Sequence, residues 1–254
     1  MWNIQTFAEL PSTQTLARTK LDNGVANHGD VFVALHQSEG RGQYNWRLWY
    51  DEPGANLLLS VILTEVPPAV IDLMQFVAGL SVLTTIRTSL SKEIPSFDEN
   101  RVRLKWPNDI LLDGKKISGI LSEAVWSGQS LKGIILGVGI NVNQQRFAEP
   151  IITKATSLRA VLSHPFPIET IRDLFLATLA STLEKYSERH TLLADLRREL
   201  SWMSSLPKVS ATQPDGFTIL GSRILGISDS GALHISTRDG VEQLLQSATI
   251  TLDE

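Results

Sequence analysis

Apolar residues in the first part of the chain gather in short runs that are typical of strands. VFVAL (31–35) and NLLLSVIL (56–63) are nearly continuous apolar runs, which we interpret as buried strands. Between them lies HQSEGRGQYNWRLWYDEPGAN, a segment rich in glycine, charged and aromatic residues. It predicts a long loop that joins the two strands.

Two helices are predicted near these strands. Ser12 is a favourable N-cap for a helix over about residues 13–22, and Gly24 is a favourable stop. Pro67-Pro68 opens a longer helix that runs to about residue 90. Its apolar side chains at positions 70, 73, 74, 77, 80 and 83 fall on one face, as in a helix that packs on a core.

The segment RVRLKWPNDILLDGKKISGILSEAVW (101–126) predicts paired strands with unusual charges. In RVRLK, Val102 and Leu104 point to one side and the basic residues to the other. Pro107 lacks the N–H that a ladder needs, so the strand ends before it. Asp113-Gly114 tolerates the positive φ angles of a tight hairpin turn. Stability alone does not require charges on the inner face of a hairpin, so we expect a ligand there.

The second half of the chain predicts one more strand, a helix and a change of architecture. GIILGVGINV (133–142) is almost wholly apolar, as in a strand with both faces covered. A helix over about residues 168–200 follows. From about residue 206 short alternating strands, with turns at Ser230-Gly231 and Asp239-Gly240, predict a small β-barrel of about 45 residues.

Together these elements predict an α+β fold. A mixed β-sheet with flanking helices would form the catalytic domain over residues 1–204, and the small β-barrel a second domain over residues 205–254. Trp106 and Trp126 are expected in the core rather than at a ligand.

Composition and missing motifs exclude several classes of protein. The net charge of −4 without a dense Lys/Arg block argues against general nucleic-acid binding, and no apolar run approaches the ~20 residues of a membrane helix. The absence of cysteine removes thiol chemistry and fits a reducing cytoplasm. The nucleophile elbow, the phosphate-binding GxxxxGK[ST] loop, the dinucleotide fingerprint and a metal-ligand spacing of histidines are all missing.

Three segments ask for a joint explanation: the loop EGRGQYNWRLW (39–49), the lysine-bearing hairpin, and the apolar strand with Gly137 and Gly139 near its end. Glycines weaken a strand unless something approaches its backbone closely. Arginines in a flexible loop can close around an anion. These features together predict a pocket for an apolar body with an anionic end.

On these segments the chain resembles the biotin–protein ligases. The matching pieces follow the family's order and are STQTLA (12–17), Gln37 followed by GRG (40–42), KWPND (105–109), KKISGIL (115–121), GVGIN (137–141) and ATSL (155–158). The resemblance implies a sheet like that of class II synthetases and biotin and lipoate ligases. It also implies that the C-terminal barrel is the small SH3-like domain of this family.

The resemblance also implies roles for single residues. Lys116 and Arg41 match the catalytic cations that contact the biotin carboxylate and the activated phosphate. The matching biotin-binding residues are Ser12, Thr13, Gln14, Gln37, Gly40, Arg41, Gly42, Lys116, Gly137 and Gly139. The matching ATP-binding residues are Gln43, Arg47, Trp49, Lys105, Asn108, Asp109, Ile140 and Asn141. No residue is assigned to a metal ion.

The activity implied by this resemblance is an ATP-dependent ligation. Biotin and ATP would form biotinyl-AMP and pyrophosphate, with Mg²⁺ on the phosphates, and a lysine of a biotin carboxyl carrier domain would then take the biotinyl group. The first strand begins at the N-terminus, so no DNA-binding domain and no regulation through DNA are expected. An exposed sheet edge would allow two copies to pair as a homodimer.

The chain departs from the family at three places. Gln43 stands where many members have a second arginine, and Gln14 replaces the asparagine of the STN start. The loop before Trp49 is one residue longer, so the residues of the family that match Trp46 and Arg47 are uncertain. Simpler roles stay open for Ser12 as a helix cap, Asp109 as a turn residue and Lys105 as a solvated charge. The rival functions are a lipoate or octanoate ligase or transferase and a non-catalytic biotin-binding regulator.

Overall fold

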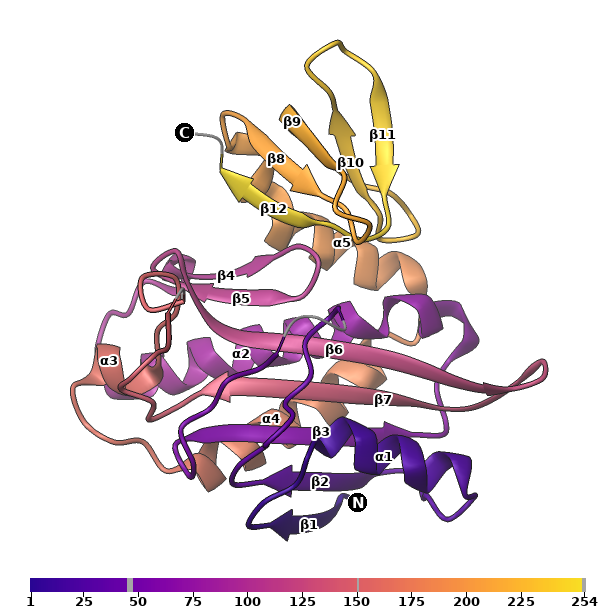
Figure 1. Cartoon of the computed structure of the whole chain (residues 1–254), viewed down its shortest axis with the longest axis vertical. Helices are drawn as coiled ribbons and strands as arrows, with labels where there is room; N and C mark the ends of the chain where they lie inside the picture. Colours follow the sequence, from indigo (N-terminus) through magenta and orange to yellow (C-terminus); the bar gives the residue numbers. More distant parts are fainter. Residues whose placement is uncertain (45–47, 150, 253–254) are drawn as a thin grey trace.

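The fold consists of two β-sheets and the helices that cover the larger one. The computed structural model describes residues 1–44, 48–149 and 151–252 (Figure 1). The large sheet has the strand order β1-β2-β3-β7-β6-β5-β4, in which β1 and β2 pair in parallel and all other neighbours are antiparallel. Its strands are β1 (Asn3–Phe7), β2 (Asp30–Ala34), β3 (Asn56–Leu63), β4 (Val102–Lys105), β5 (Asp109–Leu112), β6 (Lys115–Ser127) and β7 (Ser130–Asn141).

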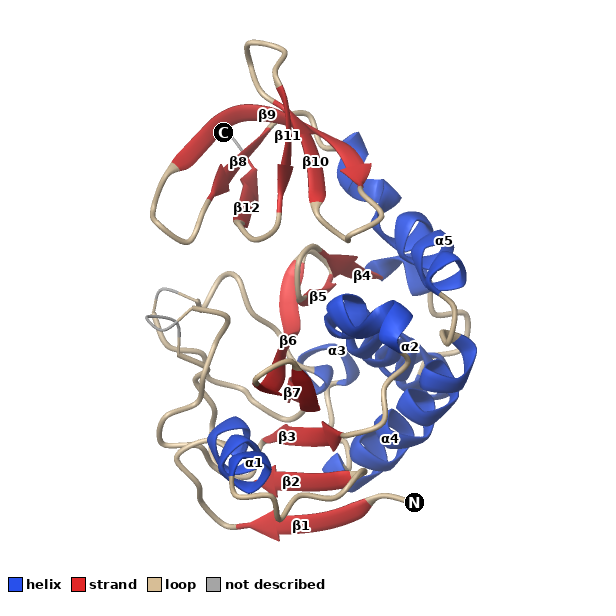
Figure 2. Cartoon of the chain, turned by 90° about the vertical axis from the view of Figure 1, so that its right-hand side faces the viewer, coloured by secondary structure: helices blue, strands red, loops and turns tan. Residues whose placement is uncertain are grey.

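Helices cover both faces of the large sheet (Figure 2). The helical segments are α1 (Thr13–Asp22), η1 (Pro68–Leu73), α2 (Met74–Glu93), η2 (Glu99–Arg101), α3 (Leu158–Leu162), α4 (Ile168–Lys185), α5 (Arg189–Leu200) and η3 (Ser201–Ser205). The main core lies between the sheet, α2 and α4. A smaller core lies under α1, where Ala17 and Leu21 contact Phe32 and Ile62. This second layer explains why β2 and β3 are apolar on both faces.

Strong local signals predicted most of these elements. The helix over 13–22 and the strands at 31–35 and 56–63 are confirmed as α1, β2 and β3. The turn Asp113-Gly114 is confirmed with φ angles of 51° and 77°. β4 ends at Lys105, before a cis peptide bond between Trp106 and Pro107. Trp106 is buried, as expected.

Three structural predictions were wrong in part. The helix expected over 168–200 is two helices, α4 and α5, because Tyr186 leaves the helical conformation and its hydroxyl bonds Asp195 of α5 at 2.6 Å. The first turns of the helix expected after Pro67-Pro68 form the 3-10 helix η1. Trp126 is 51% exposed, because it lies beside a bulge near the end of the long β6–β7 hairpin, beyond the helices (Figure 1).

The C-terminal part forms a separate antiparallel sheet with the strand order β11-β10-β9-β8-β12. Its strands are β8 (Val209–Thr212), β9 (Thr218–Ile227), β10 (Leu233–Ser236), β11 (Glu242–Leu245) and β12 (Thr249–Leu252). The turns predicted at Ser230-Gly231 and Asp239-Gly240 connect β9 to β10 and β10 to β11. Within residues 1–44, 48–149 and 151–252 no ladder joins β11 to β12, so the sheet is not a closed barrel. The domain boundary at 204/205 stays a prediction.

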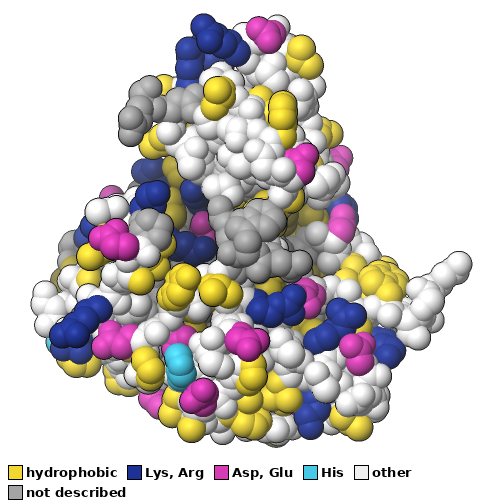
Figure 3. Space-filling model, in the orientation of Figure 1, with side chains coloured by type: hydrophobic (Ala, Val, Ile, Leu, Met, Phe, Trp, Pro, Cys, Tyr) yellow, Lys and Arg dark blue, Asp and Glu magenta, His cyan; other side chains and the backbone are white. Residues whose placement is uncertain are grey.

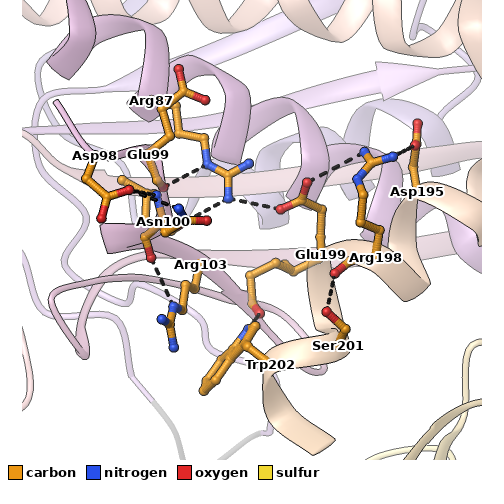
Figure 4. Close-up of polar contacts among 12 residues, drawn as sticks. Arg87, Asp98, Glu99, Asn100, Arg103, Asp195, Arg198, Glu199, Ser201 and Trp202 are labelled. Carbon is orange, nitrogen blue, oxygen red and sulfur yellow. Dashed lines mark hydrogen bonds and ion pairs between the residues drawn. The ribbon is translucent and has the colours of Figure 1, made fainter. Parts of the chain in front are cut away.

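A polar network fastens the end of α5 to the large sheet (Figure 4). Arg87 of α2 donates to the carbonyl of Val102 and to the carboxylate of Glu199, both at 2.9 Å. Trp202 of η3 donates its indole N–H to the carbonyl of Leu104 at 2.9 Å. The strand that leads into KWPND is therefore held from the side of the C-terminal sheet.

One helical segment, Pro68–Glu93, is long and apolar enough to cross a membrane. However, 72% of its most apolar window is buried inside the fold. It has the burial of a central core helix, since α2 packs between the sheet and α4.

Candidate active site

A cavity of about 110 Å³ lies between the start of α1, the β5–β6 hairpin and the β2–β3 loop. We call the described part of this loop around Gly40–Tyr44 and Leu48–Trp49 the glycine loop. Of the residues predicted for the site, those that line the cavity are Ser12, Thr13, Gln14, Gln37, Arg41, Gly42, Gln43, Trp49, Asn108, Asp109, Lys116, Gly137 and Gly139. Lys and Arg side chains gather in the hollow between the two sheets on this side of the molecule (Figure 3).

Side-chain hydrogen bonds order the polar end of the cavity at the start of α1. The Gln37 side-chain oxygen accepts from the backbone N–H and the hydroxyl of Thr13, at 2.7 and 3.1 Å. Ser60 lies 2.9 Å from the Thr13 hydroxyl and donates to the Gln14 side-chain oxygen at 3.1 Å. The Gln14 Nε2 is buried and has no hydrogen-bond partner among the described residues. A buried amide donor without a partner is costly, so this atom suits an acceptor on a ligand.

Ser12 occupies the N-cap position of α1, but its side chain makes no capping hydrogen bond. Its side chain is buried and lines the cavity instead. The simpler role left open by the sequence, that of a helix cap, is therefore not what the hydroxyl does in this structure.

Glycines form the floor of the cavity. Gly119 of β6 and Gly139 of β7 are direct partners across the ladder. A Cβ atom on Gly139 would lie 2.7 Å from the Trp49 ring, and one on Gly119 would lie 2.9 Å from it. A Cβ atom on Gly137 would lie 2.5 Å from the Gln14 side-chain oxygen. A side chain at any of these three positions would force Trp49 or the Gln14 side chain to shift, which glycine avoids.

Trp49 lies across this floor. Its indole N–H is buried and has no hydrogen-bond partner within the part of the chain that the structure describes. Pockets that hold a small ligand usually have volumes of about 300 Å³ or more. The cavity in this structure is smaller, and the Trp49 ring covers part of its glycine floor.

Two cations face the cavity from different segments. The Lys116 ammonium lies 2.5 Å from the Asp109 carboxylate and 5.6 Å from the centre of the Trp49 ring. Arg41 lies 3.5 Å from Glu123 of β6. Both basic side chains are partly exposed, at 36% and 42%. Each cation is thus held by a carboxylate and still reachable by an anion from solvent.

Backbone contacts bring the two ends of the glycine loop together. The Gly40 carbonyl accepts from the Trp49 N–H at 2.8 Å, and Arg41 and Leu48 form an isolated β-bridge. A Cβ atom on Gly40 would lie 2.5 Å from the Trp49 carbonyl. Gly40 is therefore needed for this close approach, although it does not line the cavity. Trp46 and Arg47, whose match to the family was uncertain, lie outside the described residues.

Three further predicted residues lie away from the cavity. The Ile140 side chain is fully buried in the main core. Asn141 donates its side-chain amide to the carbonyl of Thr156 at 3.0 Å, and Thr156 in turn donates its N–H to the carbonyl of Lys116 at 2.9 Å. Asn141 therefore supports the strand that carries Lys116. Lys105 is half-buried at the end of β4 and is not a lining residue. The ligand roles of all predicted residues stay predictions.

The sequence analysis missed some of the lining residues. Apart from Asn56 at its start, the strand NLLLSVIL has Ser60 as its one polar residue, and that exception was a usable signal. Gly119 lies inside KKISGIL, in a strand, as Gly137 and Gly139 do. Leu48, Leu58, Leu59, Ile120, Leu121 and Val138 also line the cavity. Nothing distinguishes these apolar residues from core residues in the sequence alone.

Comparisons with known proteins agree with this geometry. The chain is 30% identical over 246 residues to the bifunctional ligase/repressor BirA of Bacillus subtilis. This alignment covers 96% of the chain and 72% of the BirA protein. The chain is 29% identical over 224 residues to the biotin–[acetyl-CoA-carboxylase] ligase of Mycobacterium tuberculosis, covering 87% and 73% of the two chains.

Among solved structures, the biotin protein ligase from Aquifex aeolicus in complex with biotin and ATP covers 100% of both chains. It superimposes with a TM-score of 0.77 at 25% identity. The model of the biotin/lipoate A/B protein ligase family matches residues 6–141, which carry all the described lining residues of the cavity. The resemblance seen in the sequence is thereby confirmed, and the chain belongs to the biotin/lipoate A/B protein ligase family.

Proposed function

We propose that this chain is an ATP-dependent biotin–protein ligase that modifies a lysine of a biotin carrier domain. The relatives named biotin–protein ligase or biotin–[acetyl-CoA-carboxylase] ligase and the related structure with biotin and ATP support this activity. The observation that carries the proposal is the position of Lys116 and Arg41. Both cations line the same cavity as the polar network of α1 and the glycine floor.

The first half-reaction joins two anions. A carboxylate oxygen of biotin attacks the α-phosphorus of ATP, the bond to the β-phosphate bridging oxygen breaks, and pyrophosphate leaves. Lys116 and Arg41 reduce the repulsion between the reactants and stabilise the charge that develops on the phosphate. Asn108 and Asp109, which line the same cavity, form the wall beside the phosphates and the ribose.

The second half-reaction transfers the acyl group. A neutral lysine amine of the acceptor attacks the carbonyl carbon of biotinyl-AMP, and AMP leaves as an amide forms. The acyl phosphate is reactive toward water, so the site must be covered between the two steps. Trp49 and the glycine loop are placed for this, because Trp49 already lies on the glycine floor.

ATP brings Mg²⁺ to such reactions, where the ion neutralises phosphate charge. The described lining of the cavity offers one carboxylate, Asp109. Mg²⁺ in nucleotide sites is often held by one or two carboxylates and the phosphates themselves. The donor set therefore fits an ion that arrives with the nucleotide, and Asp109 would be its protein ligand.

The acceptor class follows from the relatives' names, which point to a biotin carrier domain of a carboxylase. A homodimer stays a proposal: β1 is an edge strand of the large sheet, and four of its five residues are exposed. The cytoplasmic location and the lack of binding to DNA likewise stay predictions.

The direct test mixes the purified chain with biotin, ATP, Mg²⁺ and a biotin carrier domain. We expect biotin-dependent pyrophosphate release and labelling of one acceptor lysine by mass spectrometry. Omission of ATP is the control. The family also includes lipoate ligases, so lipoate is tested in parallel. Lipoate-dependent but not biotin-dependent turnover would replace the proposal, and biotin binding without turnover would indicate a regulator.

A further inference from the structure

Ser247 of the C-terminal sheet contacts the glycine loop of the active site. It lies between β11 and β12, and its hydroxyl accepts from the Gln43 side-chain amide at 2.9 Å and lies 2.8 Å from the Tyr44 hydroxyl. Gln43 lines the cavity together with Arg41 and Gly42. We propose that Ser247 is a positioning residue that holds the glycine loop in its closed position over the cavity.

The chemistry of a hydroxyl suits this position. Serine has one donor and two acceptor lone pairs, so it can accept from the amide and exchange a second hydrogen bond with a phenol. Both distances are those of well-formed hydrogen bonds.

A serine can hold a loop only if the serine itself is fixed. The β9–β10 turn of the C-terminal sheet is tightly packed on the large domain at Gly231. A Cβ atom there would lie 2.6 Å from Phe76 and 2.7 Å from Leu73, and the Gly231 carbonyl accepts from the Trp106 indole at 3.0 Å. Trp106 directly precedes the Pro107-Asn108-Asp109 turn. The sheet is therefore docked behind one wall of the active site.

Arg189 strengthens the same docking. Its guanidinium binds the Asp72 carboxylate with two hydrogen bonds, at 2.8 and 2.7 Å, and the Asp229 carbonyl at 2.9 and 2.6 Å. The C-terminal sheet is thus fixed to η1 and α5, and its turns at the other edge face the catalytic domain (Figure 2). One of these turns carries Ser247. The C-terminal sheet acts as the fixed support against which the glycine loop closes.

This inference rests on the proposed function for one consequence. If the loop covers biotinyl-AMP between the two half-reactions, loss of its support shortens the time for which the intermediate is retained. Two neutral hydrogen bonds with partly exposed partners together change a closed-to-open equilibrium by about tenfold. The same change applies to the ligand-free protein, because Ser247 contacts the loop and does not line the cavity.

The test compares wild type with Ser247→Ala in two measurements. The first is hydrogen exchange of the Trp49 amide, which donates to Gly40 at 2.8 Å in the closed loop; we expect about tenfold faster exchange in the variant. The second is dissociation of preformed biotinyl-AMP into a streptavidin trap, which we expect to accelerate about tenfold. Ser247→Thr keeps the hydroxyl and should restore both rates, and Tyr44→Phe should give a smaller effect.

The matched control is Ser236→Ala, a half-buried serine of β10 in the same sheet. It should leave both rates at the wild-type value, and circular dichroism checks that all variants are folded. Wild-type exchange of the Trp49 amide in Ser247→Ala overturns the inference, whatever the activity. If the wild type forms no adenylate, the proposed function fails, and the exchange measurement alone decides on Ser247.

Discussion

The Lys116 ammonium lies 2.5 Å from the Asp109 carboxylate, across the β5–β6 ladder at the cavity. This contact aims the lysine at the cavity. A triphosphate carries more charge than one carboxylate, so the ligand can take over the ammonium as a partner. On the proposed role of Lys116, the ion pair with Asp109 is therefore a holding contact for a cation that acts on the phosphates.

Lys116→Ala should lower the rate of adenylation by about a hundredfold or more, because a fixed charge-assisted contact to the reacting phosphate is lost. The measurement is biotin-dependent pyrophosphate release. Lys115→Ala is the matched control, since Lys115 is the exposed neighbour on the same strand. Circular dichroism should be unchanged in both variants. An unchanged rate in Lys116→Ala would show that the role assigned to Lys116 is wrong.

Gly139→Ala should displace Trp49 from the glycine floor. The added Cβ would lie 2.7 Å from the indole ring, and overpacking of this kind costs about 1–3 kcal/mol. Urea unfolding measures the loss of stability. The decisive comparison is the same substitution in a Trp49→Ala background, where the ring is absent and the cost should largely disappear. Equal costs in both backgrounds would mean that the two residues are not in contact.

Gln14→Met tests whether the buried side-chain amide of Gln14 donates a hydrogen bond to a ligand. The Nε2 atom has no partner among the described residues, but the substitution also removes the side-chain oxygen that accepts from Ser60, so it should lower the free energy of unfolding by about 1–3 kcal/mol. Biotin affinity should fall tenfold or more, because an acceptor on the ligand would lose its donor. Calorimetric titration measures the affinity. A large loss of stability with unchanged affinity would instead assign Gln14 to the fold.

Much of this arrangement was predictable because its signals are local. The glycines of the floor, the Asp113-Gly114 turn and the order KWPND, lysine, GVGIN identify the site without any tertiary contact. Ile140 and Asn141, which the resemblance assigned to ATP, lie on β7 with Gly137 and Gly139. Ile140 faces the core because side chains alternate along a strand. Asn141, two residues after Gly139, bonds Thr156 and does not line the cavity, which no local pattern predicts.

Features that depend on distant partners were not predictable. Neither proline nor glycine marks the break at Tyr186, which follows from a contact with Asp195 nine residues later. Trp126 was expected in the core, but a register shift near the end of a long hairpin leaves it exposed. The link from Ser247 to the glycine loop spans 204 residues to Gln43. No local pattern encodes such pairs.

Asp195 predicts a pH dependence of stability. Burial alone would raise the pKa of this carboxyl, but hydrogen bonds from Lys185, Tyr186 and Arg198 outweigh it and lower the pKa to about 2. These bonds join the end of α4 to α5, at 2.6 Å from Lys185 and from Tyr186. The folded state therefore favours the ionised carboxylate.

The direction of this pH dependence follows from a comparison with the unfolded chain, in which an aspartate has a pKa of about 3.9. Because the folded pKa is lower, the stabilisation is present above about pH 4 and is lost as the pH falls toward 2. Asp195→Asn should lower the free energy of unfolding by about 2 kcal/mol at pH 6, measured with urea. The difference from wild type should shrink as the pH falls from 4 to 2.

Asp173→Asn, at a 63% exposed aspartate, is the control and should have almost no effect. A difference that stays constant from pH 6 to 2 would mean that the charge of Asp195 does not stabilise the α4–α5 turn.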